Sequence, residues 1–374
     1  MKRVPISPVD ALFSNGSYPV EMLFYYRDGF STRKLRRALR QLSSIFWPVF
    51  GEYRDGSIVF ERYREENCFA EETVGREIDR SELEGAGAKV ISRYGLPELE
   101  RLFFLKVIRF KNGLVLVPKM NHVAGDGYSY FFFLSALAAL ARPTLVPFKS
   151  SFVKSMFKPH HRRTALKDFA FEAFDVPPLV QSEDLTVEFD EIPRREVQSL
   201  IREATSSAGV HLSSNDILSA MVLKKLAGLR RESPGDGFDL TMPIDVRRQV
   251  KEYGQRFFGN GIMLHTVELR RAGIDASSLK EIAGQIRAAM PSLTTENYVG
   301  YLAGLERMIK EKSWERFRPF EPGAGCLVTN LSKLPAEKLD FGTGGPQAIV
   351  PLTIEKNSAA ILARGENYVL RFAY

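Results

Sequence analysis

The sequence predicts an α/β or α+β protein with two lobes of similar architecture. Patterns typical of strands and of helices alternate along both halves of the chain, which is the arrangement that mixed folds produce. At 374 residues the chain is long for a single hydrophobic core and long enough for two lobes of ordinary size. Its hydrophobic content of 44% and its 27 Phe residues supply the apolar side chains that two such cores need.

The first hundred residues contain one strong helical pattern between short strands. Apolar side chains recur at helical spacing from Leu35 to Phe46, with Thr32 as the expected cap and Trp47-Pro48 as the end of the helix. Two apolar runs predict the flanking strands, Met22–Tyr26 and Ile58–Phe60. The polar stretch from Asn67 to Arg101 predicts mostly helix and loop.

A β-hairpin followed by a buried helix is predicted next. The strands are Leu102–Phe110 and Leu114–Val117, and the turn signal Asn112-Gly113 joins them. Phe131–Ala141 is almost wholly apolar and contains no Gly or Pro, so it predicts a buried helix. Asp126 stands where the N-cap residue of that helix is expected.

The middle of the chain loses this periodicity. Residues 143–163 gather three prolines and the basic run Lys158-Pro-His-His-Arg-Arg, which is typical of a connecting segment. We therefore expect an N-terminal lobe at residues 1–150, a crossover linker at 151–183 and a C-terminal lobe at 184–374.

The second half begins with a strand and continues with helices. Leu185–Asp190 alternates apolar and polar side chains, Pro193 starts one helix, and Ser213 with Asp216 forms a capping-box pattern for the next. Two further helices are predicted at Ser277–Met290 and Glu296–Ile309. The remaining apolar runs predict strands at Asp239–Ile244, Gly261–Leu269, Cys326–Thr329, Ala348–Ile354, Ala359–Ala363 and Tyr368–Phe372.

The residues around His122 form the best candidate for a functional site. His122 lies in the tight connection between a predicted buried strand and the start of a buried helix, with Asp126 and Gly127 close behind it. Free N–H groups and the positive end of the helix dipole converge there, which suits an imidazole beside a developing negative charge. Two interpretations are open at this point: a catalytic histidine, or a core histidine whose neighbouring glycines only serve a turn.

Charge and composition narrow the range of partners. The net charge of +7 and the pI near 9.2 favour anionic partners, namely phosphate-bearing cofactors, an acidic carrier protein, nucleic acid or a membrane surface. No long basic block suggests a nucleic-acid arm. The longest apolar run, Phe131–Ala141, is far short of the ~20 residues of a spanning helix. We expect a cytoplasmic protein in which Cys68 and Cys326 are free thiols.

Several common catalytic motifs do not occur in the sequence. It contains no G-x-S-x-G nucleophile elbow and no G-x-x-x-x-G-K-[ST] phosphate loop. The glycine clusters at 323–325 and 342–345 do not match the dinucleotide-binding pattern. No ligand spacing predicts a metal site. The sequence therefore gives no reason to expect a nucleophile elbow, a nucleotide fold or a metal centre.

Three short motifs follow one another across the chain. His122-Val-Ala-Gly-Asp-Gly127 has the pattern H-x-x-x-D-G, Asp245-Val-Arg247 precedes Phe258-Gly-Asn260, and Asp340-Phe-Gly-Thr-Gly344 lies near the end. Together they resemble the chloramphenicol acetyltransferase superfamily, which includes the plant BAHD acyltransferases, peptide-synthetase condensation domains and polyketide-associated acyltransferases. Thr343 stands in place of the tryptophan of the BAHD D-F-G-W-G signature.

The resemblance implies a fold and a mechanism. The fold would be two similar chloramphenicol-acetyltransferase-like lobes with an active-site channel between them, and His122 would lie midway along the channel. As a general base, His122 would take the proton of an acceptor hydroxyl or amine while the acceptor attacks a thioester carbonyl. The oxyanion needs preorganised donors, and our candidates are the backbone N–H of Gly127 and, from the other lobe, Thr329 or Asn330.

The resemblance also implies structural roles for other motif residues. Asp126 is expected to point away from the channel and to pair with Arg247. Three residues of the last motif are expected to be structural and distant from the base: Asp340, Gly342 and Gly344. The phosphates of a coenzyme A substrate need cations, and the candidates are Lys158, Arg162 and Lys224.

We therefore predict an O- or N-acyltransferase that moves an acyl group from acyl-CoA to the hydroxyl or amine of a small molecule. No permanently bound cofactor and no metal are expected. One alternative is a condensation-type enzyme that receives acyl groups from the phosphopantetheine of an acyl carrier protein. Another is a non-catalytic relative that serves as a docking module. We also expect a monomer that binds no nucleic acid and does not span a membrane.

Overall fold

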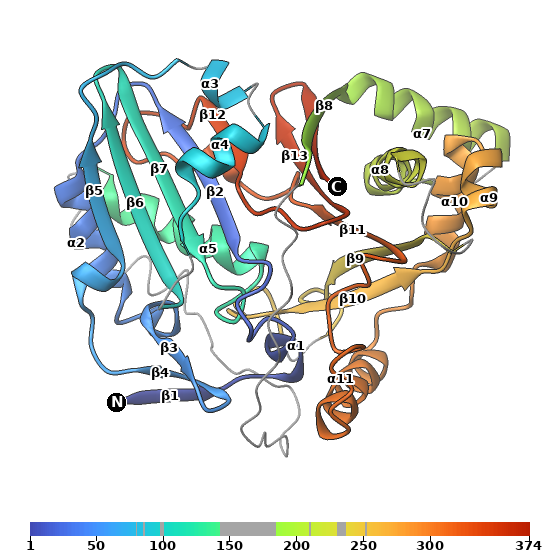
Figure 1. The fold of residues 1–374 in the computed structure, drawn as a ribbon, viewed down its shortest axis with the longest axis horizontal. Helices are drawn as coiled ribbons and strands as arrows, with labels where there is room; N and C mark the ends of the chain where they lie inside the picture. The colour runs from blue at the N-terminus through green and yellow to red at the C-terminus, as the bar shows by residue number, and fades with distance from the viewer. Residues whose placement is uncertain are drawn as a thin grey trace.

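Two large β-sheets with helices packed against them form the body of the molecule (Figure 1). The structure is a computed structural model that describes residues 1–79, 81–84, 87–97, 101–142, 185–208, 211–229, 237–250 and 253–374. The predicted crossover linker at 151–183 lies outside the described residues. The predicted mixed fold with two lobes is confirmed, because one large sheet is built mainly from the first half of the chain and the other from the second half.

The N-terminal lobe is built on a five-stranded sheet with the strand order β12-β2-β7-β6-β5. Its strands are β2 (Val20–Tyr26), β5 (Phe69–Thr73), β6 (Phe103–Phe110), β7 (Gly113–Met120) and β12 (Ala348–Pro351). The pair β6–β7 is the predicted hairpin, with Phe110 opposite Gly113 at the turn. Only β5 and β6 run parallel among the neighbouring strands of this sheet.

Helices cover both faces of this sheet. Helices α2 (Thr32–Leu42) and α5 (Gly127–Ala141) lie on one face, and α3 (Ser81–Glu84) and α4 (Gly87–Tyr94) lie on the other. Alternate residues of β2 enter the two resulting cores, so Phe24 packs with α5 and Tyr25 packs on the side of α4. A strand that is buried on both faces does not alternate apolar with polar residues, which explains the apolar run Met22–Tyr26 within β2.

A small sheet and a short helix complete the N-terminal region. The three-stranded sheet has the order β1-β4-β3, with β1 (Lys2–Pro5), β3 (Glu52–Arg54) and β4 (Ser57–Phe60). Helix α1 (Pro8–Ala11) follows β1 directly and begins with a capping box between Ser7 and Asp10. Short 3₁₀ helices occur at Trp47–Phe50, Glu65–Asn67 and Ala336–Lys338.

The C-terminal lobe is built on a six-stranded sheet with the order β10-β9-β11-β13-β14-β8. Its strands are β8 (Val187–Pro193), β9 (Asp239–Asp245), β10 (Ile262–Val267), β11 (Gly325–Asn330), β13 (Ser358–Arg364) and β14 (Asn367–Ala373). One face of the sheet carries α7 (Arg194–Ala208), α8 (Ser214–Leu229), α9 (Arg271–Ala276) and α10 (Leu279–Ala289). The last helix is α11 (Thr295–Lys310).

The other face of the six-stranded sheet is directed toward the N-terminal lobe. Leu327, Leu362 and Val369 on this face belong to the same hydrophobic cluster as Phe24 and Phe131 of the first lobe. The alternate residues of the same strands pack beneath the helices instead. The two lobes therefore share one large apolar core.

One strand beyond residue 184, the predicted start of the C-terminal lobe, belongs to the N-terminal lobe. Strand β12 lies within the predicted C-terminal lobe, yet it pairs antiparallel with β2 and forms an edge of the N-terminal sheet. The segment just before β12 is also held by the first lobe. The Phe341 ring stacks on Phe30 at a centroid distance of 4.6 Å, and the Tyr26 hydroxyl donates to the carbonyl oxygen of Leu339 at 2.8 Å.

Most predicted elements are present, and the differences from the prediction are local. Helix α2 is capped by Ser31, whose hydroxyl accepts from the Lys34 N–H, and not by Thr32. The stretch at 67–101 contains strand β5, which was not predicted because its sequence Phe-Ala-Glu-Glu-Thr has little apolar content. Strands β1 and β3 and helices α1 and α9 were also not predicted.

Replacement of Phe341 by Ala should lower the free energy of unfolding by about 3–5 kcal/mol, because it removes a buried ring that joins the two lobes. Phe341 is only 2% exposed. Urea denaturation measures the change, and Thr343→Ala at an exposed position two residues away is the control. A loss below about 1 kcal/mol for Phe341→Ala would mean that the segment does not hold the lobes together.

Candidate active site

His122 lies in a short turn between β7 and α5, as predicted. The turn is closed by hydrogen bonds from the Ala124 N–H to the Asn121 carbonyl at 2.9 Å and from the Gly125 N–H to the His122 carbonyl at 3.2 Å. The Asn121 side chain accepts from the Val123 N–H at 3.0 Å. These contacts fix the main chain of the histidine through bonds within the turn itself.

The His122 ring is held on one side by an aromatic side chain. It stacks on Phe13 with a centroid distance of 3.9 Å and an interplanar angle of 27°. Within the described part of the chain, its Nδ1 atom is buried and has no hydrogen-bond partner. Burial lowers the pKa of His122 to about 4, although the carboxylate of Asp126 raises it in part. The imidazole is therefore neutral at pH 7 and able to accept a proton.

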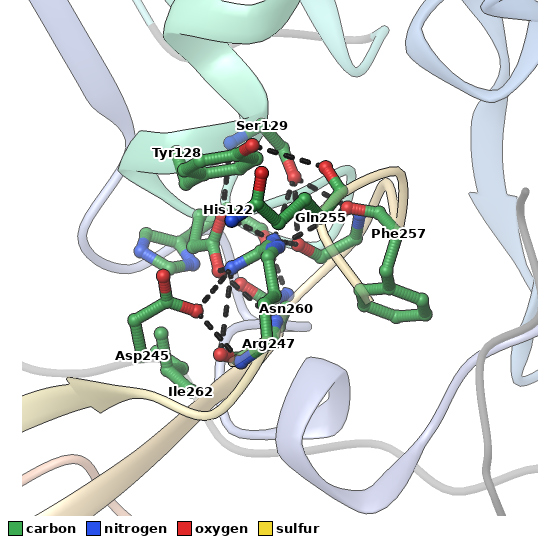
Figure 2. Close-up of polar contacts among 12 residues, drawn as sticks. His122, Tyr128, Ser129, Asp245, Arg247, Gln255, Phe257, Asn260 and Ile262 are labelled. Carbon is green, nitrogen blue, oxygen red and sulfur yellow. Dashed lines mark hydrogen bonds and ion pairs between the residues drawn. The ribbon is translucent and has the colours of Figure 1, made fainter. Parts of the chain in front are cut away.

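Asn260 is drawn beside His122 in Figure 2, and its contacts connect three segments at the site. Its side-chain amide donates to the His122 carbonyl oxygen at 2.8 Å and to Oδ1 of Asp10 at 2.7 Å. Asp10 itself is buried in α1, where its other oxygen accepts from the Ser7 N–H at 2.8 Å. The backbone of the histidine is thus tied to both the C-terminal lobe and the N-terminal helix.

Asp126 and Arg247 form a buried bidentate ion pair. Nη1 of Arg247 lies 2.8 Å from Oδ2 of Asp126, and Nη2 lies 2.9 Å from Oδ1. The Arg247 side chain is 1% exposed and the Asp126 side chain is 4% exposed. Against the effect of burial, the guanidinium of Arg247 holds the pKa of Asp126 below its usual value. Asp126 also caps α5 by accepting from the Ser129 N–H at 2.9 Å. The carboxylate is therefore fully occupied, and no hydrogen bond joins it to the His122 ring in the described residues.

The loop after Phe258 completes the surroundings of Arg247. The Gly259 carbonyl accepts from Nη2 of Arg247 at 2.9 Å and from the Ser129 hydroxyl at 2.8 Å. Gly259 has a φ of +145°, which a residue with a side chain rarely adopts. A Cβ atom at Gly261 would lie 2.8 Å from the guanidinium carbon of Arg247. Both glycines are needed for the loop to approach the arginine this closely.

The first turn of α5 faces the loop that follows β11. A Cβ atom at Gly127 would lie 3.1 Å from a methyl group of Leu331, so the helix start and this loop are in contact. Thr329 lies on the face of β11 that is directed toward the N-terminal lobe, because it pairs in register with Ala360 and alternates with Val328 of the helix-covered face. Gly127 and Thr329 therefore approach the interlobe region from opposite lobes.

Asn330 does not lie where it was predicted to act. Its amide donates to the Asn215 side chain of α8 at 2.8 Å, and its oxygen accepts from the Ser332 N–H at 3.0 Å. It pairs in register with Ile361, which packs beneath the helices. Adjacent residues of a strand point to opposite faces, so Asn330 and Thr329 cannot both face the base. The prediction for Asn330 is corrected accordingly.

The predicted phosphate ligand Lys224 also lies elsewhere. Its ammonium group donates to the Ser277 carbonyl at 2.6 Å, between α8 and the start of α10, on the helix-covered side of the sheet. It braces the helical layer and does not face the N-terminal lobe. The other two candidates, Lys158 and Arg162, lie outside the described residues.

The last motif is structural in its contacts. One oxygen of Asp340 accepts from the N–H groups of Gly342 and Gly344 at 2.7 and 2.9 Å. Its main-chain carbonyl accepts from Nε of Arg142, at the end of α5, at 2.7 Å. Among the described residues it has no contact with His122. The segment thus anchors the C-terminal end of α5, whereas the base lies before its N-terminal end.

Three residues of the site were not predicted: Phe13, Asp10 and Ser129. Phe13 and Asp10 come from the first elements of the chain, more than a hundred residues before His122, so no local pattern relates them to it. Ser7 and Asp10 do form a capping-box pattern that would have located helix α1. In the part of the chain that the structure describes, no group of three His, Cys, Asp or Glu side chains could hold a metal ion. No helix among the described residues is long and apolar enough to cross a membrane.

The fold and the turn that carries His122 define a class of enzyme, the acyltransferases with an H-x-x-x-D-G motif between two lobes. Comparison with known proteins agrees with this class. The model of the Transferase family matches residues 90–367, and the chain belongs to this family, which contains the BAHD acyltransferases. The resemblance to BAHD enzymes is thereby confirmed.

Two characterised relatives have similar sequences. The piperamide synthase of Piper nigrum is 23% identical over 354 residues, which cover 89% of this chain and 74% of that protein. The spermidine hydroxycinnamoyltransferase 1 of Oryza sativa subsp. japonica is 21% identical over 224 residues, which cover 57% of this chain and 51% of that protein.

Solved structures share the fold. The structure of F. sporotrichioides TRI101 complexed with coenzyme A and T-2 superimposes with a TM-score of 0.76 at 14% identity, covering 99% of this chain and 94% of that one. Vinorine synthase gives a TM-score of 0.75 at 16% identity, covering 100% and 90%. The first condensation domain of the calcium-dependent antibiotic synthetase gives 0.60 at 14% identity, covering 100% and 91%. The predicted fold with two chloramphenicol-acetyltransferase-like lobes is therefore correct.

Breaking the ion pair should destabilise the protein in a non-additive way. Asp126→Asn and Arg247→Met should each lower the free energy of unfolding by about 3–5 kcal/mol, because each leaves a buried group without its partner. The double variant should lose clearly less than the sum of the two. Chemical denaturation of all three variants measures the coupling, with Arg248→Met at the adjacent exposed position as control. Additive losses would contradict a direct energetic coupling of the pair.

Proposed function

We propose that the protein transfers an acyl group from acyl-CoA to the hydroxyl or amine of a small molecule, with His122 as the general base. Membership of the family supports the reaction class. The observation that supports the base is the neutral imidazole at the start of α5, held by its own main chain and by Phe13. Asp126 is bound to Arg247 and has no part in the proton transfer.

The proton transfers use the outer nitrogen of the ring. Nδ1 is buried, so Nε2 is the atom that takes the proton of the acceptor as its oxygen or nitrogen attacks the thioester carbonyl. The tetrahedral intermediate places negative charge on the former carbonyl oxygen. When it collapses, the carbon–sulfur bond breaks and the thiolate of coenzyme A takes the proton back from Nε2. No acyl-enzyme forms in this sequence.

Stabilisation of the oxyanion is assigned to two groups that approach from opposite lobes. The N–H groups of the first turn of a helix have no partner within the helix and face the positive end of its dipole. Gly127 is the first residue of α5, and its lack of a side chain lets the loop after β11 approach the helix start. Thr329 supplies a hydroxyl from the interlobe face of β11. Donors fixed in this way before the reaction lower the barrier without reorganisation.

The acceptor is an amine or an alcohol. The names of the relatives include a piperamide synthase and a spermidine hydroxycinnamoyltransferase, and another relative is the O-acyltransferase pigD of Monascus ruber, which is 23% identical over 144 residues. An amine and an alcohol each lose one proton to the general base when they attack the thioester. An acyl carrier protein as the donor, a monomeric state and a cytoplasmic location stay predictions.

Replacement of His122 by Ala should lower kcat by roughly 10²–10⁴-fold, because it removes the general base. Thiol release from acetyl-CoA and from longer acyl-CoAs, with a panel of amines and alcohols, measures the rate. Circular dichroism should show an unchanged fold. The control is His211→Ala at an exposed position of the C-terminal lobe, which should retain full activity. Equal turnover of His122→Ala and the wild type would refute the proposed mechanism.

The rate should remain high to an unusually acidic pH. His122 must be unprotonated to act, and its pKa of about 4 keeps it so well below the ordinary histidine range. The value of kcat/KM should therefore be level between pH 8 and about pH 5 and should fall as the pH approaches 4. As a control for acid unfolding, samples held at each pH are returned to pH 7, where they should regain full activity. An acid limb centred near 6.5 would show that the base titrates as an ordinary exposed histidine.

A further inference from the structure

A buried arginine lies on the interlobe face of the C-terminal sheet. Arg371 of β14 is 5% exposed. Its neighbours in sequence, Leu370 and Phe372, pack beneath the helices, whereas Val369 belongs to the core shared with the N-terminal lobe. Because side chains alternate along a strand, Arg371 is directed toward the N-terminal lobe, as Val369 is.

The register of the sheet relates Arg371 to the proposed oxyanion site. Thr329 of β11 pairs with Ala360 of β13, and Ala360 pairs with Arg371 of β14. The three residues form one row on the interlobe face, in which Thr329 and Arg371 are two strands apart, or about 10 Å. The residue between them in this row is Ala360, whose side chain is a methyl group. The row therefore has a hydroxyl at one end, a guanidinium at the other and a small residue in the middle.

The guanidinium of Arg371 lacks partners. Within the described residues neither Nε nor Nη1 has a hydrogen-bond partner, although both atoms are buried. A fully buried arginine is rare, and it is almost always paired when it occurs. The buried Arg247 illustrates the usual case, since its hydrogen-bonding atoms contact Asp126, Asp245 and main-chain carbonyls. An unpaired buried polar group in a folded protein needs a specific explanation.

Glu355 is the acidic group near Arg371, but it does not neutralise it by direct contact. Its carboxylate accepts from the Tyr18 N–H at 3.2 Å, and no hydrogen bond or ion pair joins it to Arg371 among the described residues. Burial raises the pKa of Glu355 to about 7, even though the charge of Arg371 lowers it. A carboxyl group that is partly protonated at neutral pH compensates the charge of Arg371 only in part.

Aromatic contacts connect this region with the base. The ring of Tyr18 contacts Phe13 edge to face at 6.3 Å, and Phe13 stacks on His122. Tyr18 also contacts Phe320 at 6.2 Å. Through its hydrogen bond from the Tyr18 N–H, Glu355 adjoins an aromatic series that begins at the catalytic ring. We infer that the body of a substrate follows this series from His122 toward Arg371.

We propose that Arg371 is a specificity residue that binds a carboxylate on a substrate of the acyl transfer. The planar guanidinium matches a carboxylate in a bidentate arrangement, and the carboxylate would supply the partners that Nε and Nη1 lack. The substrate carries this carboxylate at the end of its body remote from the reacting group. The inference rests on the proposed function, and the carboxylate belongs either to the acceptor or to a dicarboxylic acyl chain.

The test compares charged compounds with uncharged counterparts. For the acceptor, 3-hydroxybenzoate is compared with its methyl ester, using acetyl-CoA as donor. For the acyl chain, glutaryl-CoA is compared with hexanoyl-CoA, using benzylamine as acceptor. Values of kcat/KM are measured for the wild type, Arg371→Met and Arg364→Met. The last is a matched control, because Arg364 lies on neighbouring β13, half-exposed, in an ion pair with Glu191.

In one of the two comparisons the wild type should favour the charged compound by about 10–100-fold, the range expected for hydrogen bonds to a charged group. The comparison that responds identifies the source of the carboxylate. Arg371→Met should lose this preference and Arg364→Met should keep it. The melting temperature of Arg371→Met should be unchanged or higher, because replacing a buried charge by an apolar side chain of similar size does not destabilise.

Equilibrium binding of the same four compounds, measured by calorimetry without the second substrate, separates the two proposals. A charge preference in binding that depends on Arg371 supports the carboxylate site even if no thiol is released, and that combination would refute only the proposed acyl transfer. No preference for the charged compound in either comparison, or a preference that persists in Arg371→Met, overturns the carboxylate site.

Discussion

The buried ion pair between Asp126 and Arg247 is the constraint on which the geometry of the site depends. Asp126 begins α5 in the N-terminal lobe, and Arg247 follows β9 in the C-terminal lobe. Two charges removed from water are tolerated only when their remaining hydrogen-bonding atoms are also satisfied. Here Arg247 also donates to the Ser129 hydroxyl and to the Gly259 carbonyl, and Asp126 also accepts from the Gly261 N–H. The start of α5, and with it the turn of His122, is thereby fixed relative to both lobes.

The histidine itself is positioned by main-chain contacts and packing. Asn260 holds its carbonyl oxygen, Asn121 closes its turn, and Phe13 covers one side of its ring. The nearby carboxylate contributes to its electrostatics but is directed to the arginine. This arrangement differs from a Ser-His-Asp triad, in which the acid orients the imidazole by a hydrogen bond. Here the same orientation comes from the backbone, and burial keeps the ring neutral.

Much of the local structure could be predicted from the sequence, and the long-range contacts could not. The hairpin before His122 and the cap of α5 follow from turn chemistry and apolar periodicity, which act within a few residues. Asp126 and Arg247 are 121 residues apart, so only the family resemblance related them. Strand β5 was missed because it is an edge strand whose Glu71 and Glu72 pair with basic residues on neighbouring elements. Asn330 was misplaced because a shift of one residue along a strand moves the side chain to the opposite face of the sheet.

The position of β12 constrains when the N-terminal sheet can form during synthesis. Strand β2 is made early, but its outer neighbour in the sheet comes more than 300 residues later. Until that strand arrives, β2 exposes a row of unpaired N–H and C=O groups and apolar side chains that belong to the shared core. On a ribosome, where synthesis proceeds at about 5–20 residues per second, this edge stays open for roughly 15–60 seconds. The N-terminal lobe therefore becomes complete only shortly before the C-terminal lobe receives its last two strands, β13 and β14, although most of its residues are made first.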